Sequence, residues 1–112
     1  MGVRPSKSTQ SPPGRPTPAQ VLLGIEIRGL RMRLGVSQRQ LVRILGLQAH
    51  SNMGDYENGR RIPPADIVTA CEQALQAPPG YLSRLRAEAL ADRARLWRHR
   101  QLLEQDDTVH SE

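Results

Sequence analysis

The stretch VSQRQLVRILGLQAHSNMGDYENGRR, residues 36–61, constrains the fold of this chain more than any other feature. Ser37 and Gln40 have the spacing of a capping box, in which each side chain hydrogen-bonds the backbone N–H of the other residue. Gly46 then stands where a glycine ends a short helix. A second helical pattern covers residues 50–58 and is also followed by a glycine. The stretch therefore predicts two short helices joined by a tight turn. The first of them is expected to face the core through Leu41, Ile44 and Leu45.

Helical patterns also flank this stretch on both sides. Leucine and isoleucine recur at steps of three and four over residues 19–34, which predicts an amphipathic helix. Pro64 suits the first turn of a further helix, because its missing N–H would have no intrahelical partner there. A last helical pattern, rich in Ala, Leu, Arg and Glu, spans residues 81–105. The chain has no Phe and few other aromatic residues, so its core must be aliphatic. We therefore expect an all-α fold of five helices with an extended C-terminal helix.

Composition divides the chain into four regions. Residues 1–18 are rich in Pro, Ser and Thr and cannot bury enough apolar surface to order themselves, so we expect a disordered basic arm. Residues 19–85 form the predicted helical domain, and residues 86–105 form a helical extension of it. Residues 106–112 are expected to be a disordered tail.

The basic charge of the chain is unevenly distributed. The formal net charge is +5 and the pI is near 10.6, which favours a polyanionic partner. Residues 19–80 carry seven arginines against five acidic residues, whereas residues 81–112 carry six of each. The excess therefore lies in the domain and in the arm. The basic residues of the arm either stay solvated or contact the polyanion; they are Arg4, Lys7 and Arg15.

Several classes of protein are not favoured by the composition. A single cysteine, Cys71, cannot form an internal disulfide and has no zinc-binding spacing, so we expect a reducing cytoplasm, no metal and no cofactor. No apolar run approaches the length of a membrane span, and the N-terminus lacks the apolar segment of a secretory signal. His50, Ser51 and Asp55 are the residue types of a hydrolytic triad. All three fall on one short predicted helix, which leaves no separate oxyanion site, so an enzyme is not expected. Lys7 is the only lysine among many arginines, which suggests a GC-rich bacterial genome.

Residues 23–75 resemble the phage-repressor-like, or xenobiotic-response-element (XRE, Cro-like), helix-turn-helix family. The resemblance rests on GVSQ at residues 35–38, on Leu45-Gly46, and on YENGRR at residues 56–61 followed by Pro63. It covers about half of the chain. It implies a transcription regulator of the bacterial cytoplasm and nucleoid that binds double-stranded DNA as a dimer. The helix near residues 50–58 would read the major groove.

The resemblance also implies roles for particular side chains. Gln38 would bind a phosphate at the start of its helix, aided by the helix dipole. The residues that would meet base edges are His50, Ser51, Asn52 and Asp55. That helix has no Arg or Lys of its own, so attraction to phosphates would come from the surrounding Arg39, Arg43, Arg60 and Arg61. Arg31 and Glu57 match a structural ion pair that ties the first helix to the third.

Two features of this region depart from the family pattern. Residues 46–57 are one residue longer than the usual spacing, so the turn must bulge or the third helix must start earlier. Gly54 lies inside that helix, which costs about 1 kcal/mol relative to Ala and indicates either a weak helix or a close backbone approach.

The last helix leaves a second function open. Its loose heptad of apolar residues is interrupted by Asp92 and His99 and comprises Leu82, Leu85, Ala89, Leu96 and Leu103. This helix is either a frayed extension or a surface for a homodimer or a second protein. In the latter case the chain is a protein-interaction module or an antitoxin-like regulatory subunit.

Overall fold

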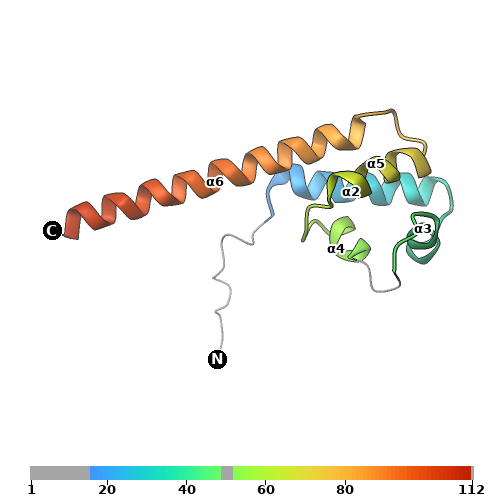
Figure 1. Cartoon of the computed structure of the whole chain (residues 1–112), viewed down its shortest axis with the longest axis horizontal. Coiled ribbons are helices and arrows are strands. Elements are labelled where there is room, and N and C mark those ends of the chain that lie inside the picture. Colours follow the sequence, from blue (N-terminus) through green and yellow to red (C-terminus); the bar gives the residue numbers. More distant parts are fainter. Residues whose placement is uncertain (1–15, 49–51, 112) are drawn as a thin grey trace, which may run out of the picture.

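Helices joined by short loops make up the described structure, a computed structural model (Figure 1). It describes residues 16–48 and 52–111, and the side chains of residues 16–48 and 52–104. Within these ranges there is no strand, and the elements are α2 (Pro18–Arg33), α3 (Gln38–Ile44), α4 (Met53–Glu57), α5 (Ala65–Ala74) and α6 (Tyr81–Ser111). The predicted all-α fold of five helices with a long C-terminal helix is confirmed.

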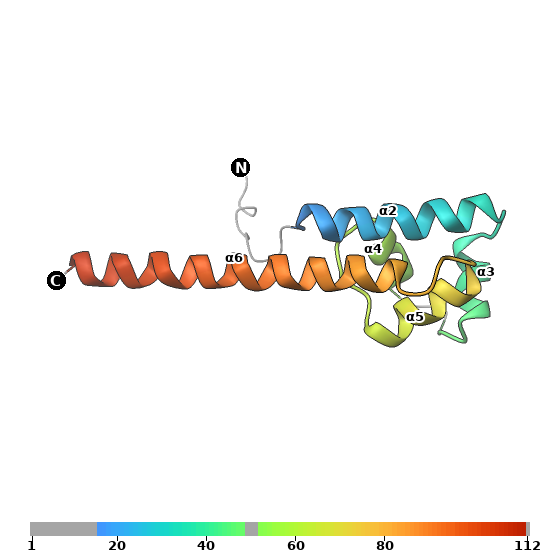
Figure 2. The same ribbon diagram turned by 90° about the horizontal axis from the view of Figure 1, so that it is seen from above.

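An aliphatic core lies between these helices. Its fully buried side chains come from all five of them and include Leu23, Ile27, Leu41, Met53, Val68, Cys71 and Leu82. Each buried Leu or Ile contributes about 1.5–3 kcal/mol by leaving water. α2 and the first half of α6 run antiparallel side by side (Figure 2), and α5 packs against α6. The two short helices α3 and α4 therefore sit on one side of a frame made by the longer ones.

Hydroxyl side chains cap the starts of α2 and α3. The Thr17 hydroxyl accepts a hydrogen bond from the Gln20 N–H at 3.3 Å, and proline occupies the first turn, so α2 begins at residue 18, just before its predicted start. The Ser37 hydroxyl accepts from the Gln40 N–H at 3.0 Å, and the Ser37 N–H donates to the Gln40 side chain at 2.8 Å. The predicted capping box is confirmed. Residues 1–15 of the predicted arm, with their three basic residues, lie outside the described residues.

Four helices end in the same backbone geometry. Gly35, Gly46 and Gly59 follow α2, α3 and α4 with φ of +71°, +71° and +77°, a conformation that L-residues rarely adopt. The next N–H then bonds back to the helix, as from Leu47 to the Val42 carbonyl at 2.9 Å, which makes a Schellman motif. After α5 the same position is taken by Gln76 at φ +61°, without the freedom of glycine. The prediction that glycines end the two short helices is confirmed.

α2 and α4 meet at a close backbone approach. A Cβ atom on Gly24 would lie 2.4 Å from the Tyr56 carbonyl oxygen and 2.5 Å from that of Glu57. One turn earlier on α2, the Gln20 amide donates to the Gly59 carbonyl at 2.7 Å. Only glycine fits at position 24, and these contacts fix the C-terminal end of α4 on α2.

A buried carboxylate holds the start of α6. Glu72 of α5 is 6% exposed and accepts a hydrogen bond from the Ser83 N–H at 2.8 Å. Burial alone would raise the pKa of Glu72, but backbone donors of Ser83, Gly80 and Leu82 outweigh it and hold the pKa below its ordinary value. Glu72 therefore serves α6 as an N-cap side chain would, and it ties α5 to α6.

α6 divides into an anchored part and a projecting part. Leu82, Leu85 and Ala89 are buried against the domain, whereas none of residues 90–104 is buried. The 31 residues of α6 span about 46 Å and reach far beyond α2 (Figure 2). The helix also continues through residues 106–111, so the predicted disordered tail is wrong there. Residues 81–111 contain no Pro or Gly, so no residue in them breaks the helix.

Two further predictions about the short helices are wrong. The pattern predicts a helix over residues 50–58, but α4 begins at Met53, with Asn52 outside the helix at φ −87° and ψ 21°. The extra residue between positions 46 and 57 is thus not accommodated by an earlier start of the helix.

Ile44 was expected to face the core but is 60% exposed. The face of α3 that packs on the core runs through Leu41, Val42 and Leu45, and Ile44 lies about 100° around the helix from its centre.

Candidate nucleic-acid interface

The Arg31–Glu57 ion pair expected from the resemblance is present and largely buried. Arg31 Nε donates to Glu57 Oε2 at 2.7 Å and Nη2 donates to Oε1 at 3.0 Å, so the pair is bidentate. The two side chains are 12% and 1% exposed. Arg31 Nη1 also donates to the Val36 carbonyl at 2.8 Å. One guanidinium therefore joins α2 and the loop before α3 to the end of α4.

Gln38 completes this network from the start of α3. Its side-chain nitrogen donates to Glu57 Oε1 at 2.9 Å, although the residue as a whole is exposed. The Glu57 carboxylate thus accepts hydrogen bonds from α2 and from α3, and it couples both short helices to the frame. The structure gives Gln38 this structural contact, and its contact with a phosphate stays a prediction.

A groove between α3 and α4, here called the α3–α4 groove, has a cationic edge. Its lining comprises Gln38, Arg39, Val42, Arg43, Leu47, Met53 and Gly54. Arg39 and Arg43 are exposed and stand four residues apart, so they share one face of α3. A Cβ atom on Gly54 would meet nothing closer than Gln38 Oε1, at 3.8 Å. Space therefore does not require a glycine at position 54, and no close backbone approach explains it.

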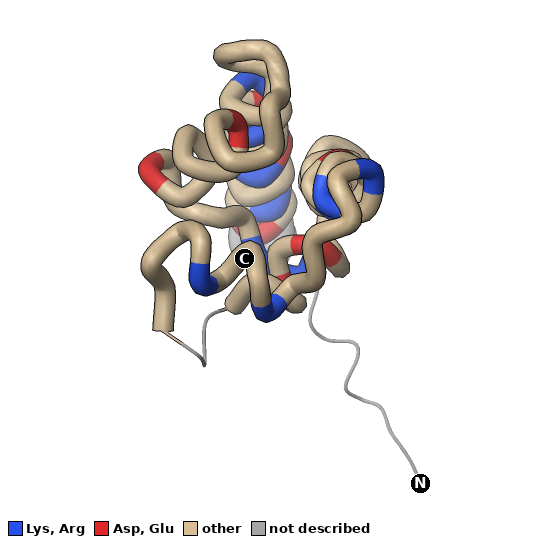
Figure 3. Tube along the Cα trace, turned by 90° about the vertical axis from the view of Figure 1, so that its right-hand side faces the viewer, with Lys and Arg blue, Asp and Glu red and all other residues tan. Residues whose placement is uncertain are grey.

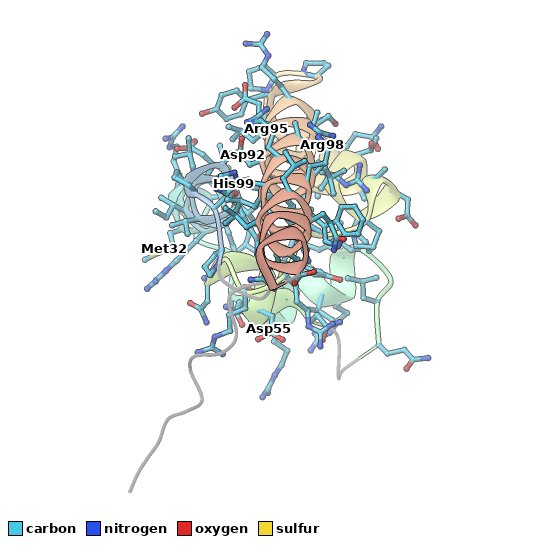
Figure 4. All side chains as sticks on the ribbon, turned by 90° about the vertical axis from the view of Figure 1, so that its left-hand side faces the viewer. Met32, Asp55, Asp92, Arg95, Arg98 and His99 are labelled. Atoms are coloured by element: carbon cyan, nitrogen blue, oxygen red, sulfur yellow. The ribbon has the colours of Figure 1, made fainter. Side chains whose placement is uncertain are left out.

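A second groove lies on the other side of α4 and is here called the α4–α5 groove. Its lining comprises Asn52, Asp55, Tyr56, Arg60, Arg61, Ile62, Pro64 and Arg93. Arg60 Nη1 and Arg61 Nε lie 3.5 and 3.3 Å from the two carboxylate oxygens of Asp55. The two arginine side chains are 71% and 61% exposed. Asp55 thus pairs with two guanidiniums at the edge of the domain (Figure 4), and its contact with a base edge stays a prediction.

The two grooves bring together the predicted contact residues that the structure describes. One side of α4 carries Gln38, Arg39 and Arg43, and the other carries Asn52, Asp55, Arg60 and Arg61. Asn52 is exposed at the start of α4, and its side chain makes no capping hydrogen bond. His50 and Ser51 lie outside the described residues. α4 is thus a short ridge with arginines on both sides.

This arrangement of two short helices on a helical frame matches a known kind of domain. A helix-turn-helix domain family matches residues 22–85, more than half of the chain. The chain belongs to this helix-turn-helix family. The crystal structure of the clp gene regulator ClgR from Corynebacterium glutamicum is similar in fold, with a TM-score of 0.52 at 19% sequence identity, over 88% of this chain and 100% of that one. Comparison of the sequence with curated proteins gives no match.

Charged residues lie on several sides of this helix-turn-helix domain. Figure 3 shows basic positions interspersed with acidic ones along several of its segments, so overall charge does not single out a surface. The grooves beside α4 are more distinctive. The α3–α4 groove is lined by two arginines and no carboxylate, and the α4–α5 groove by three arginines and one carboxylate. The face that presents α4 is therefore net positive.

Two arginines of α6 near the helix-turn-helix were missed in the sequence. Arg93 lines the α4–α5 groove, and Arg86 Nε donates to the Pro63 carbonyl at 2.8 Å. Arg93 lies beyond residues 22–85, which the family matches. The spacing of seven residues from Arg86 to Arg93, repeated at Arg100, was the available signal, because it places the three side chains on one face of a helix.

Other kinds of site find little support in the described part of the helix-turn-helix chain. No group of three or more His, Cys, Asp or Glu residues is placed there to hold a metal ion. None of its helices is long and apolar enough to cross a membrane. Burial, together with the negative charges of Glu57 and Glu72, raises the pKa of Cys71 to about 11. That thiol is therefore an unreactive part of the core.

Proposed function

We propose that this chain is a sequence-specific, DNA-binding transcription regulator of the XRE, Cro-like type, acting at the nucleoid in the bacterial cytoplasm. The observation that carries the proposal is the position of α4 between two grooves that are both lined by arginines. The major groove of DNA admits one α-helix, and phosphates border the groove on both sides of that helix. α4 enters the major groove, with Arg39 and Arg43 on one phosphate strand and Arg60 and Arg61 on the other.

The start of α4 carries the base contacts in this proposal. Asn52 is exposed there with its amide free of a capping bond, and an Asn amide can pair with the N6 and N7 atoms of adenine. His50 and Ser51 keep the same role, on the basis of the resemblance alone. Asp55 acts differently from our expectation: it orients Arg60 and Arg61 toward phosphates while neutralising part of their charge.

Selection from random-sequence DNA across a salt series tests the proposal. We expect one enriched site whose affinity falls steeply as salt rises. Arg61→Gln should weaken binding to all sequences and lower the salt slope by about 1, whereas Asn52→Ala should change the preferred base. Arg28→Gln removes an exposed arginine of α2 that lines neither groove and should bind as the wild type does. Failure to enrich any site at the lowest salt would refute the function.

We further propose that two copies of the chain pair through α6. Leu96 and Leu103 are 55% and 52% exposed, and they continue the seven-residue spacing of buried Ala89 past the start of α2. Together with Trp97 and residues 16–18 they line an apolar groove, which no side chain among residues 16–48 and 52–104 fills. A second α6 has the matching apolar stripe. Such a dimer would present two α4 ridges to successive major grooves, about 34 Å apart.

The oligomeric state tests this pairing directly. Trp97 is the only tryptophan of the chain, so its emission should shift to shorter wavelength as the dimer forms. Sedimentation should show the same transition. Leu96→Glu should give a monomer at every concentration, whereas Leu102→Glu, at a residue 61% exposed on another side of α6, should not. A wild-type chain that stays monomeric in both measurements would contradict the proposal.

A second candidate function uses the same apolar surface. If Leu96, Trp97 and Leu103 receive a different protein, the chain is an interaction module or an antitoxin-like regulatory subunit. The exposure of these three side chains is the observation that favours it. A chain truncated after Ala89 should then lose the partner while its domain remains folded. Retention of every cellular interaction by that truncated chain would exclude this function.

A further inference from the structure

Arg93 stands apart from the other basic residues near α4, because it belongs to α6. It lines the α4–α5 groove together with Arg60 and Arg61, although 31 residues separate Arg61 from Arg93 in the sequence. It also lies outside the part of the chain that the helix-turn-helix family matches. The groove therefore combines the motif with a residue that the motif does not contain.

A backbone contact explains how α6 reaches this groove. Arg86 Nε donates to the Pro63 carbonyl at 2.8 Å, which fastens the loop between α4 and α5 to α6. Arg93 follows Arg86 by seven residues, so it lies within about 20° of the same face of α6, two turns further along. The contact that positions the loop therefore also positions Arg93 beside it.

The charges in this groove are not balanced. Three guanidiniums line it, from Arg60, Arg61 and Arg93, against the single carboxylate of Asp55. That carboxylate is already paired with Arg60 and Arg61, and Arg93 lies too far along the chain to be part of the clamp that the family motif supplies. A net positive groove of planar donors suits a phosphate oxygen, which arginine binds through paired hydrogen bonds.

We infer that Arg93 of α6 is an additional phosphate-binding residue, which extends the DNA contact from the Arg60–Arg61 loop onto the C-terminal helix. This inference rests on the proposed DNA-binding function and adds to it a contact beyond the helix-turn-helix motif. The ligand is a backbone phosphate that flanks the segment read by α4. Because phosphate contacts carry no sequence information, Arg93 contributes affinity on every sequence and does not change the preferred site.

The test compares full-length Arg93→Gln with a matched variant, Arg98→Gln. Arg98 is exposed on the same helix and is five residues further on, about 140° around it; Figure 4 shows Arg98 and Asp55 on different sides of α6. Affinity for the selected DNA site is measured for both variants and for Arg61→Gln between about 50 and 200 mM salt. Ethylation of single phosphates locates the contact that each arginine makes.

We expect Arg93→Gln to lower the magnitude of the slope of log affinity against log salt by about 0.9. The ratio of wild-type affinity to variant affinity should therefore change about 3.5-fold over this salt range. Ethylation of one phosphate outside the base-read segment should weaken the wild type and leave Arg93→Gln unaffected. Arg98→Gln should match the wild type. Arg93 also borders the apolar groove of α6, so sedimentation is needed as a control. It should show the same oligomeric state for all variants.

Different outcomes overturn different parts of the argument. If the wild type binds DNA and Arg61→Gln lowers its slope, but Arg93→Gln does not, the inference is wrong and the proposed function stands. If Arg93→Gln loses affinity only by changing the oligomeric state, the inference is also wrong. Inorganic phosphate that competes more strongly than chloride at equal ionic strength, and only when Arg93 is present, would indicate a free-anion site instead. If the wild type binds no DNA at low salt, both proposals fail.

Discussion

Replacement of Arg31 by methionine tests the contact that holds α4 in place. Methionine keeps much of the apolar stem but removes the guanidinium that gives Glu57 two of its hydrogen bonds, at 2.7 and 3.0 Å. The Glu57 side chain, 1% exposed, would then keep only the bond from Gln38 at 2.9 Å. The variant therefore leaves a buried carboxylate without its counter-charge.

The expected cost of this variant is large relative to the whole stability. Breaking a buried ion pair by removing one partner costs about 3–5 kcal/mol. A domain of roughly 70 residues has a free energy of unfolding of only about 3–10 kcal/mol. Arg31→Met should therefore be at the edge of unfolding at room temperature. Arg28→Met, on an exposed part of the same helix, should change stability by no more than about 0.5 kcal/mol.

The double variant Arg31→Met/Glu57→Gln separates buried charge from lost packing. The Glu57→Gln substitution removes the unpaired charge, so it should restore part of the free energy of unfolding that Arg31→Met loses. The coupling energy between the two substitutions should be about 1–3 kcal/mol. Urea unfolding followed by far-UV circular dichroism is the suitable assay, because Trp97 is exposed on α6 and its fluorescence does not report on the core. Additive effects, within about 0.5 kcal/mol, would show that Glu57 is not an uncompensated charge in the single variant and would refute the reasoning.

Four further predictions concern backbone geometry and titratable groups. Gly24→Ala should destabilise the domain by about 1–3 kcal/mol in thermal unfolding, whereas Gly29→Ala, where an added Cβ meets nothing within 4 Å, should stabilise it by up to about 1 kcal/mol. Gln76→Gly should stabilise it by about 1 kcal/mol, because φ is positive there; no gain in urea midpoint would contradict this. Cys71 should resist thiol reagents at about pH 8 until urea unfolds the chain, since burial raises its pKa to about 11. Glu72→Gln should cost about 1–2 kcal/mol at neutral pH. The pKa of Glu72 is lowered in the folded state, so its stabilisation is complete above the unfolded pKa of about 4.3 and is lost as the pH falls further; the two stability curves should converge at low pH.

Local rules in the sequence predicted the start of α3 and the C-terminal ends of α3 and α4. The Ser37–Gln40 capping box depends only on residues three apart, and Gly46 and Gly59 end helices because of their own backbone freedom. Such features need no knowledge of the rest of the fold. The same holds for Leu23 and Ile27 of α2, which are buried at a helical spacing, whereas Leu34, at the end of the same pattern, is 40% exposed.

Contacts between distant elements were not predictable in this way. Ile44 fits the apolar pattern of α3, but only the placement of the other helices decides which side of that short helix is covered. Glu72 caps a helix that begins beyond a proline turn, and Arg86 binds a carbonyl 23 residues away. In the candidate site, the pairing of Asp55 with Arg60 and Arg61 was not predicted, because it depends on how the loop folds back on α4.

The division of α6 at Ala89 affects which amino-acid substitutions this chain can accept during evolution. Since no side chain of residues 90–104 is buried, substitutions in this half leave the aliphatic core of the domain unchanged. The distal turns can also unfold and refold locally without exposing the core. In the proposed function, the surface that selects a partner and the surface that selects a DNA site therefore lie in different parts of the chain, so substitutions that change one of these specificities should leave the other unchanged.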